Sequence, residues 1–443
     1  MKRCLGLFVA SSLLTLAAGA AHASSPATCG MFISDLIVSV NGQATTVESG
    51  PGGVLVNGAF CGWPDEIASV QVWGGALNDR VTLRGSFIPG DTATLELSGG
   101  NDQVLFSSAP QNALWLNSDA DTDFQVSNDV EVFKLMGMGG DDTLFAEAST
   151  IPTLYLYGGD GNDNLTGADA GNDFIYGDAG NDRLFGAGGD DTMEGGPGSD
   201  DLQGSDGFDT VDYRTRTAPV FVTMADSAAN DGEAGEQDNV EAGIERVLGG
   251  KGNDVLTGSP ALETLDGGAG NDLLDGGLGG DVLIGGAGKD TVDYSSRSGT
   301  VNVAINMFSD DGEAFELDFV DGTVENVTGG SGDDFLVGSA SGNILRGGGG
   351  NDNLQGGDGN DFLYGDAGDD SLLGEAGADK LYGADGIDVL DGGAGADTFS
   401  AGAGNDFLYN DDGVAETVNC GGGNADDAEV DSGAVDTLIS CEL

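Results

Sequence analysis

Aspartate recurs at the sixth position of a nine-residue unit through the middle of this 443-residue chain. The unit reads Gly-Gly-x-Gly-x-Asp-x-apolar-x, with clean copies at 158–166, 267–275, 347–355 and 356–364. Carboxylate and carbonyl oxygens are the ligands that Ca²⁺ prefers, and a glycine-rich turn can present both. The sequence therefore predicts calcium ligands at Asp142, Asp163, Asp173, Asp182, Asp191, Asp200, Asp209, Asp254, Asp272, Asp281, Asp290, Asp334, Asp352, Asp361, Asp370, Asp379, Asp388, Asp397 and Asp406.

The other positions of the unit indicate how these aspartates are held. Glycine at positions one, two and four permits positive φ angles and tight turns. The apolar residue at position eight is the middle of a three-residue strand, with its side chain facing inward. Two units would form one coil of about 18 residues, and stacked coils would share a thin core. Aspartates two units apart, such as Asp352 and Asp370 or Asp361 and Asp379, should then lie side by side.

Stacked carboxylates need a counter-ion. Two carboxylates about 5 Å apart repel by about 3 kcal/mol at an effective dielectric constant of about 20. The chain has 76 Asp and Glu against 14 Lys and Arg, a formal net charge of −62, so basic side chains are too few to balance them. We expect multiple Ca²⁺ ions, since Mg²⁺ demands a tighter octahedral shell and retains water. Two positions of the series carry Glu263 and Asn343 instead of aspartate.

The same charge balance excludes several functions. An acidic chain repels nucleic-acid phosphates and anionic lipid headgroups. The one histidine is His22, near the N-terminus, so the rest of the chain has none for Ser-His-Asp catalysis or zinc ligation. We therefore expect no enzymatic activity. The alternatives are a carbohydrate-acting enzyme with a carboxylate pair, or a glycan-binding module, within residues 24–136.

The N-terminus has the pattern of a secretory signal peptide over residues 1–23. A short basic start precedes an apolar run, and Ala21-His22-Ala23 fits a small-x-small cleavage site that would leave Ser24 first. No later run is apolar and long enough to span a bilayer. We expect a secreted, extracellular product, free or associated with a cell surface. The alternatives are an uncleaved anchor and a lipoprotein acylated at Cys29.

Four cysteines remain after the signal segment, two near each end of the chain. The favoured pairing is Cys29 with Cys61 and Cys420 with Cys441, one disulfide per end. Four cysteines allow three connectivities, so the sequence alone leaves the other two open. An exported chain favours disulfides over catalytic or metal-binding thiols.

The periodic pattern also divides the chain into regions. Before the arrays, strand-like runs recur at 68–73, 93–98, 113–118 and 130–135. The expected regions are a degenerate β-solenoid cap at 24–136, a first array at 137–212, an insert at 213–248, a second array at 249–293, an insert at 294–328, a third array at 329–409 and a C-terminal cap at 410–443.

The two inserts resemble each other. Both open with DTVDY, and DGEAGEQD at 231–238 in the first matches DGEAFELD at 311–318 in the second. The offset of 80 to 81 residues indicates that an insert and its following array were duplicated together. We expect wider coils or surface loops of the same solenoid, with an extra calcium site or a partner-binding face as alternatives.

Taken together, the nine-residue array over about 137–409 resembles the RTX, or hemolysin-type, calcium-binding repeat. The resemblance implies a parallel β-roll in which sixth-position aspartates and turn carbonyls of neighbouring coils share each Ca²⁺. The alternative, a glycine-rich disordered linker, does not explain the strict spacing. The fold class expected is all-β: a parallel β-roll or β-helix solenoid with two inserts, a β-rich N-terminal cap and a disulfide-closed C-terminal cap.

The function expected is that of a secreted calcium-binding repeat protein whose Ca²⁺ ions drive folding of a structural or interaction module. Its partners would be calcium ions and a cell-surface or matrix glycan or protein. No toxin or protease domain is visible, so the resemblance implies no cytolytic activity. Many RTX proteins are exported through an uncleaved C-terminal signal. This chain differs from them, because it has the pattern of a cleavable N-terminal signal.

Overall fold

A computed structural model describes strands within residues 30–126 and the chain from residue 133 onward. Its gaps are 147–152, 225–227, 242, 306–310, 315, 411–412, 423–425, 431–436 and 442–443. Side chains are described from residue 135, apart from these gaps and residues 138, 146, 410, 429 and 430. The predicted signal peptide at 1–23 and the predicted Cys29–Cys61 disulfide lie outside the residues whose side chains are described.

The described residues form strands and no helix, and accordingly include no helix that could cross a membrane. They divide into two compact units, 1–207 and 208–443. In both units successive strands stack in parallel, each beside the strand one coil away. The expected all-β parallel solenoid is therefore confirmed.

The first unit contains three parallel stacks. The predicted runs at 68–73, 93–98, 113–118 and 130–135 all overlap strands of one stack. Its members are β2 (Asp35–Ser39), β6 (Ser69–Trp73), β8 (Thr92–Ser98), β10 (Leu114–Asp119), β12 (Phe133–Gly139), β14 (Leu154–Asp160), β16 (Phe174–Ala179) and β18 (Thr192–Glu194). The second stack is β11 (Asp123–Val126), β13 (Thr143–Ala146), β15 (Asn164–Thr166), β17 (Arg183–Gly188) and β19 (Asp201–Asp206). The third is β3 (Ala44–Gly50), β7 (Arg80–Arg84) and β9 (Gln103–Phe106), and the antiparallel additions are β1 (Gly30–Met31), β4 (Gly53–Val56) and β5 (Ala59–Gly62).

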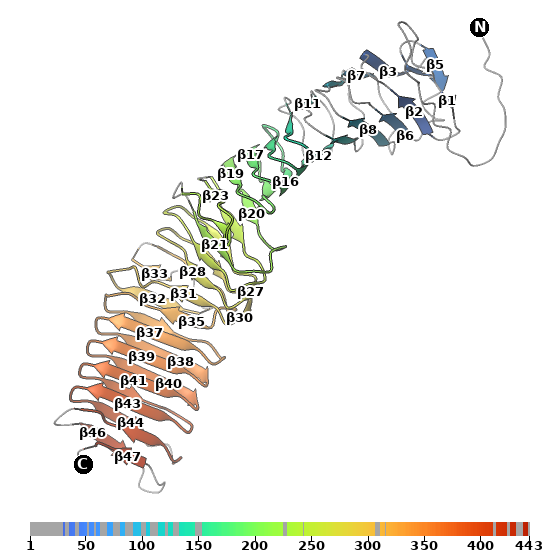
Figure 1. The fold of residues 1–443 in the computed structure, drawn as a ribbon. Coiled ribbons are helices and arrows are strands. Elements are labelled where there is room, and N and C mark those ends of the chain that lie inside the picture. The colour runs from blue at the N-terminus through green and yellow to red at the C-terminus, as the bar shows by residue number, and fades with distance from the viewer. Residues whose placement is uncertain are drawn as a thin grey trace. The chain divides into compact units, whose positions relative to one another are not determined.

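The second unit also has three main stacks, which Figure 1 shows as successive arrows. One runs through the unit: β21 (Val220–Thr223), β25 (Val255–Thr257), β28 (Leu273–Asp275), β31 (Thr291–Asp293), β35 (Asn326–Thr328), β37 (Ile344–Gly349), β39 (Phe362–Ala367), β41 (Lys380–Asp385), β43 (Thr398–Ala403), β45 (Thr417–Asn419) and β47 (Thr437–Ile439). Another is β20 (Thr210–Asp212), β24 (Arg246–Leu248), β26 (Thr264–Asp266), β29 (Val282–Ile284) and β34 (Phe319–Val320). The third is β32 (Val301–Ala304), β36 (Phe335–Val337), β38 (Asn353–Gly359), β40 (Ser371–Gly377), β42 (Val389–Asp391), β44 (Phe407–Asn410) and β46 (Asp427–Val430). Short additional strands are β22 (Gly232–Glu233), β23 (Asn239–Val240), β27 (Ala269–Gly270), β30 (Ala287–Gly288) and β33 (Gly312–Glu313).

The core is the stacked eighth-position side chains. Leu354 of β38 pairs in register with Leu372 of β40, one coil of 18 residues later, and Leu345 pairs with Leu363 in the same way. All four side chains are at most 1% exposed. A coil contributes only two such side chains, so each coil depends on its neighbours for burial.

The second insert changes which stacks continue. β34 pairs with β29 and is the last described strand of that stack, while β32 opens the stack that continues through β36. Among the described stacks, only the one containing β31 and β35 continues from one side of this insert to the other. The insert is therefore a wider coil built into the solenoid, with β33 folded back on β32 as an antiparallel hairpin.

The regular nine-residue step ends near residue 409, but the parallel pairing does not. β45 pairs with β43, β46 with β44, and β47 with β45. A disulfide joins Cys420 to Cys441 and ties this last coil together, as predicted for these two cysteines.

Removing this disulfide should destabilise the C-terminal coil. The bond closes a loop with a sequence separation of 21, which corresponds to about 3 kcal/mol of unfolded-state entropy. We expect the double variant Cys420→Ala/Cys441→Ala to lose about that much in calcium-saturated denaturant unfolding. An unchanged unfolding midpoint would show that strand pairing alone closes this end.

Candidate metal centre

The sixth-position aspartates line the turns of the coils. All of those predicted as ligands are buried, with at most 3% of each residue exposed. Glu263, which replaces aspartate in one unit, is equally buried. Burial of so many carboxylates is not expected in an ordinary core, because an unpaired charge is costly to remove from water.

Along an array, one carboxylate oxygen of an aspartate accepts the backbone amide of the aspartate one coil earlier. The amide of Asp352 donates to Asp370 Oδ1 at 2.8 Å, and the amide of Asp370 donates to Asp388 Oδ1 at 2.9 Å. On the other side of the roll, the amide of Asp361 donates to Asp379 Oδ1 at 2.8 Å. The predicted side-by-side placement of aspartates two units apart is thus confirmed.

The second carboxylate oxygen is buried and has no hydrogen-bond partner in most array turns. A buried acceptor without a partner marks strain, chemistry or a missing ligand. This applies to Oδ2 of Asp163, Asp182, Asp272, Asp281, Asp290, Asp352, Asp361, Asp370, Asp379, Asp388 and Asp406, and to Oε2 of Glu263.

The first-position glycine of most turns leaves space beside this oxygen. A Cβ placed on Gly365 would lie 2.3 Å from Asp370 Oδ2 and 2.8 Å from the carbonyl oxygen of Gly383. A Cβ on Gly374 would lie 2.6 Å from both Asp379 Oδ2 and the Gly392 carbonyl oxygen. A carboxylate oxygen and a carbonyl oxygen therefore converge on the space that glycine leaves.

Burial raises the pKa of these aspartates. The pKa rises from 3.8 to about 7 for Asp352 and Asp388, because desolvation disfavours the charged form and neighbouring aspartates add repulsion. The backbone hydrogen bond that each accepts opposes this rise. For Asp361 the same causes raise the pKa to about 6. Near neutral pH, the calcium-free turn therefore favours uptake of a proton or a cation.

These observations fit a hard divalent cation. Among the described residues no group of three or more His, Cys, Asp or Glu side chains gathers to hold a metal, so carboxylates alone do not form a site. The unpartnered aspartate oxygens and the neighbouring turn carbonyls supply the all-oxygen set that Ca²⁺ takes. The array aspartates of the turns would hold Ca²⁺, which when bound supplies the positive charge that these turns lack.

Three predicted ligands lie in a different kind of turn. In Asp173, Asp254 and Asp334 the Oδ2 atom accepts an amide hydrogen from the same turn, donated by Ala168 at 2.6 Å, Gly250 at 2.5 Å and Gly330 at 2.7 Å, respectively. Their Oδ1 atoms accept amides from the preceding coil, at 2.7 to 2.8 Å. Position two of the Asp254 and Asp334 turns lies outside the left-handed region that array turns use, for example at Gly348 with φ 104°. Their carboxylates are already satisfied.

This difference predicts contrasting effects of two conservative substitutions. We expect Asp370→Asn to lower the number of bound Ca²⁺ ions, because its unpartnered oxygen lies in an array turn. We expect Asp334→Asn to keep the number unchanged and to lower stability by about 1–2 kcal/mol, because it loses an amide acceptor. Calcium analysis after equilibrium dialysis tests both, and equal losses from the two variants would contradict the distinction.

Sequence spacing missed several residues that occupy the same structural position. The amides of Asp209 and Asp290 donate to Glu245 Oε2 at 2.8 Å and to Glu325 Oε2 at 3.0 Å. The amide of Asp281 donates to Asp318 Oδ1 at 2.9 Å. The inserts lengthen the step to 35–37 residues, so counting by nine fails there. The sequence signal that could have identified Glu245 and Glu325 is the similarity between IERV at 244–247 and VENV at 324–327.

The C-terminal coil has a similar case. The amide of Asp406 donates to Asp426 Oδ1 at 3.3 Å, across a step of 20 residues. Asp426 is 4% exposed. In the other substituted turn, Asn343 Oδ1 accepts the Ser339 amide at 2.7 Å, and its amide group donates to the Glu325 carbonyl at 2.7 Å.

The stacked coils, buried aspartate turns and unpartnered oxygens define a parallel β-roll with turns suited to cations. The family model described as RTX calcium-binding nonapeptide repeat (4 copies) matches residues 157–193, 194–212, 241–261, 261–292, 321–354, 328–363, 346–381 and 382–414. The matched segments, which span residues 157–414 apart from 213–240 and 293–320 of the inserts, are thus RTX calcium-binding nonapeptide repeats, as the sequence indicated. A search of curated proteins found no match.

Proposed function

We propose that this is a secreted calcium-binding repeat protein, in which Ca²⁺ bound in the turns drives folding of an extracellular structural or interaction module. The observation that supports this most strongly is the series of buried carboxylate oxygens without partners. Each costs free energy in the calcium-free roll, and the formal net charge of −62 adds long-range repulsion.

Such a chain would couple metal binding to folding. Extracellular calcium modules bind at about 10⁻⁴–10⁻³ M, well above the calcium level of cytosol. The chain would then stay expanded before export and fold outside the cell. The signal-like segment at residues 1–23 and the Cys420–Cys441 disulfide support this location, since disulfides persist in oxidising compartments.

Export can be tested directly on the producing cells. Cell fractionation followed by N-terminal sequencing should find the chain outside the cytosol and starting at Ser24. A cytosolic chain that retains residues 1–23 would contradict the proposal. Retention on cells, reversed by chelator, would favour attachment to a surface glycan or protein over a free product.

The role proposed is non-catalytic. Support comes from the absence of histidine after His22 in the sequence and from the burial of the array carboxylates within the turns. Incubating the calcium-loaded full chain with a panel of polysaccharides and measuring new reducing ends tests this. Sustained release of reducing ends would overturn the non-catalytic assignment and favour a carbohydrate-acting enzyme.

A further inference from the structure

Each insert carries a buried arginine in a matching set of side chains. Arg216 is 9% and Arg297 is 6% exposed, although most basic side chains in the described ion pairs are far more exposed. Both belong to a Tyr-x-x-Arg segment, at 213–216 and 294–297. Both precede an Asp-Gly-Glu-x-x-Glu-x-Asp segment, at 231–238 and 311–318. The nine-residue repeat contains neither segment.

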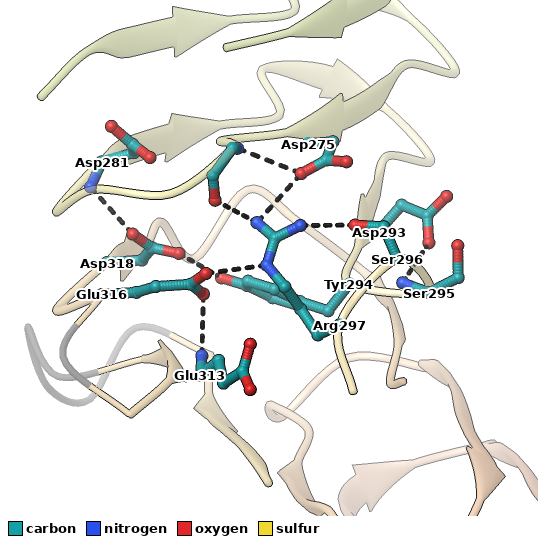
Figure 2. Close-up of polar contacts among 11 residues, drawn as sticks. Asp275, Asp281, Asp293, Tyr294, Ser295, Ser296, Arg297, Glu313, Glu316 and Asp318 are labelled. Atoms are coloured by element: carbon teal, nitrogen blue, oxygen red, sulfur yellow. Dashed lines mark hydrogen bonds and ion pairs between the residues drawn. The ribbon is translucent and has the colours of Figure 1, made fainter. Parts of the chain in front are cut away.

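The guanidinium of Arg297 binds oxygens of the kinds that calcium takes. Nε donates to Glu316 Oε1 at 2.7 Å, and Nη2 donates to Asp275 Oδ1 at 3.1 Å and to the carbonyl oxygen of Gly277. Nη1 donates to the Ser296 hydroxyl at 2.6 Å. Figure 2 shows the guanidinium between Asp275, Ser296 and Glu316. Gly277 is position two of the Asp281 turn, one turn before the last turn that precedes the insert.

Glu316 and Asp318, in the insert, have both carboxylate oxygens occupied. Glu316 Oε2 accepts the Glu313 amide at 2.7 Å. Asp318 Oδ1 accepts the Asp281 amide at 2.9 Å, as in an array turn, but its Oδ2 accepts the hydroxyl of the fully buried Tyr294 at 2.9 Å. In array turns the corresponding Oδ2 is unpartnered, so here a tyrosine hydroxyl supplies what the array turn lacks (Figure 2).

The first insert repeats this arrangement. Arg216 Nη1 contacts Glu236 Oε1 at 3.0 Å, and Glu236 Oε2 accepts the Glu233 amide at 2.9 Å. The hydroxyl of Tyr213 donates to Asp238 Oδ2 at 3.2 Å. The network is therefore present in both copies of the duplicated insert, 80 to 81 residues apart.

The first turn after each insert is also satisfied without metal. Asp254 and Asp334 have both carboxylate oxygens bonded to backbone amides. The second insert therefore ends the series of Asp281 on a tyrosine hydroxyl, and the turn that follows each insert is closed. A fully satisfied buried network holds its geometry better than a partly satisfied one.

We propose that the two inserts are calcium-independent coils, in which a buried guanidinium and a tyrosine hydroxyl replace Ca²⁺ and hold the coil folded as a template for the adjoining arrays. This inference rests on the proposed calcium-driven folding of the arrays. It assigns the Tyr-Arg-Glu-Asp sets a positioning role, and it predicts two classes of coil with different responses to chelator.

Hydrogen exchange of the full chain, in chelator and in Ca²⁺, tests this inference. In chelator, peptides covering 294–328 should exchange at least about tenfold more slowly than peptides covering 344–409, because only the former keep satisfied polar groups. Calcium should slow exchange mainly in 344–409. Equally fast exchange of both regions in chelator would overturn the inference and leave calcium-driven folding intact. Slow exchange of both in chelator would overturn calcium-driven folding as well.

Variants locate the effect. Arg297→Gln should raise exchange in 294–328 by about tenfold in chelator, and Tyr294→Phe should give a smaller increase, because it removes one hydroxyl. Arg346→Gln is the control, since Arg346 forms an ion pair with Asp366 at 2.8 Å but is 46% exposed. If Arg297→Gln and Arg346→Gln change exchange in 294–328 equally, the guanidinium of Arg297 does not hold the insert folded, and the inference is wrong.

Discussion

Replacing Gly350 with alanine is expected to destabilise the calcium-loaded third array by about 3 kcal/mol or more. Gly350 has φ 114°, which costs about 1–2 kcal/mol for a residue with a Cβ. Its Cβ would also lie 2.2 Å from the carbonyl oxygen of Gly332, which is backbone of the preceding coil and can move only if the stack opens. Alanine should therefore separate the coils and weaken calcium binding between them.

Gly349, the preceding residue in the same turn, provides a matched control. A Cβ on Gly349 would meet its nearest atom, Ser331 Cα, at 3.8 Å, which is ordinary contact. We expect Gly349→Ala to stay within about 0.5 kcal/mol of the parent chain. Denaturant unfolding in saturating Ca²⁺ compares the two variants. A loss at Gly350 no larger than that at Gly349 would show that coils are not stacked as closely as the structure has them.

The second large effect concerns pH. In the calcium-free roll, burial raises the pKa of Asp182, Asp272 and Asp352 to about 7, from 3.8. A raised pKa means that the folded chain holds its protons more tightly than the unfolded chain does. The resulting stability is fully present below about pH 4 and is lost as pH rises through about 7. The calcium-free chain should therefore be more stable at pH 5 than at pH 8.

Calcium should reverse this trend, because Ca²⁺ and protons compete for the same carboxylates. Calcium affinity should rise across about pH 5–8, as the aspartates lose the protons that compete with the metal. The residual far-UV β signal of the stripped chain and calcium titrations, both at pH 5, 6.5 and 8, measure the two trends. A stripped chain with more β signal at pH 8 than at pH 5 would contradict the burial of these carboxylates.

The array could be predicted from the sequence because its geometry is local and repeats every coil. From the nine-residue step alone, Asp352 could be placed beside Asp370 and the eighth-position leucines could be placed in one core. The inserts broke this reasoning. Asp318 and Glu325 occupy array positions after steps of 37 and 35 residues, which no fixed period finds.

The state of each carboxylate was also beyond sequence reasoning. Asp334 and Asp352 occupy the same position of the same unit, yet Asp334 has both oxygens bonded to amides and Asp352 has one unpartnered. The difference depends on the backbone at position two and on which strand lies one coil earlier. The contact of Arg297 with Glu316 likewise joins residues 19 apart and follows no periodic signal.

The central claim is that calcium folds the arrays. Far-UV circular dichroism of the calcium-stripped chain, titrated with Ca²⁺ and in parallel with Mg²⁺, tests it most directly. If calcium folds the arrays, most of the β signal should appear cooperatively with Ca²⁺ near about 10⁻⁴–10⁻³ M, and Mg²⁺ should fail to produce it. A full β signal in the stripped chain, or an equal response to Mg²⁺, would contradict it.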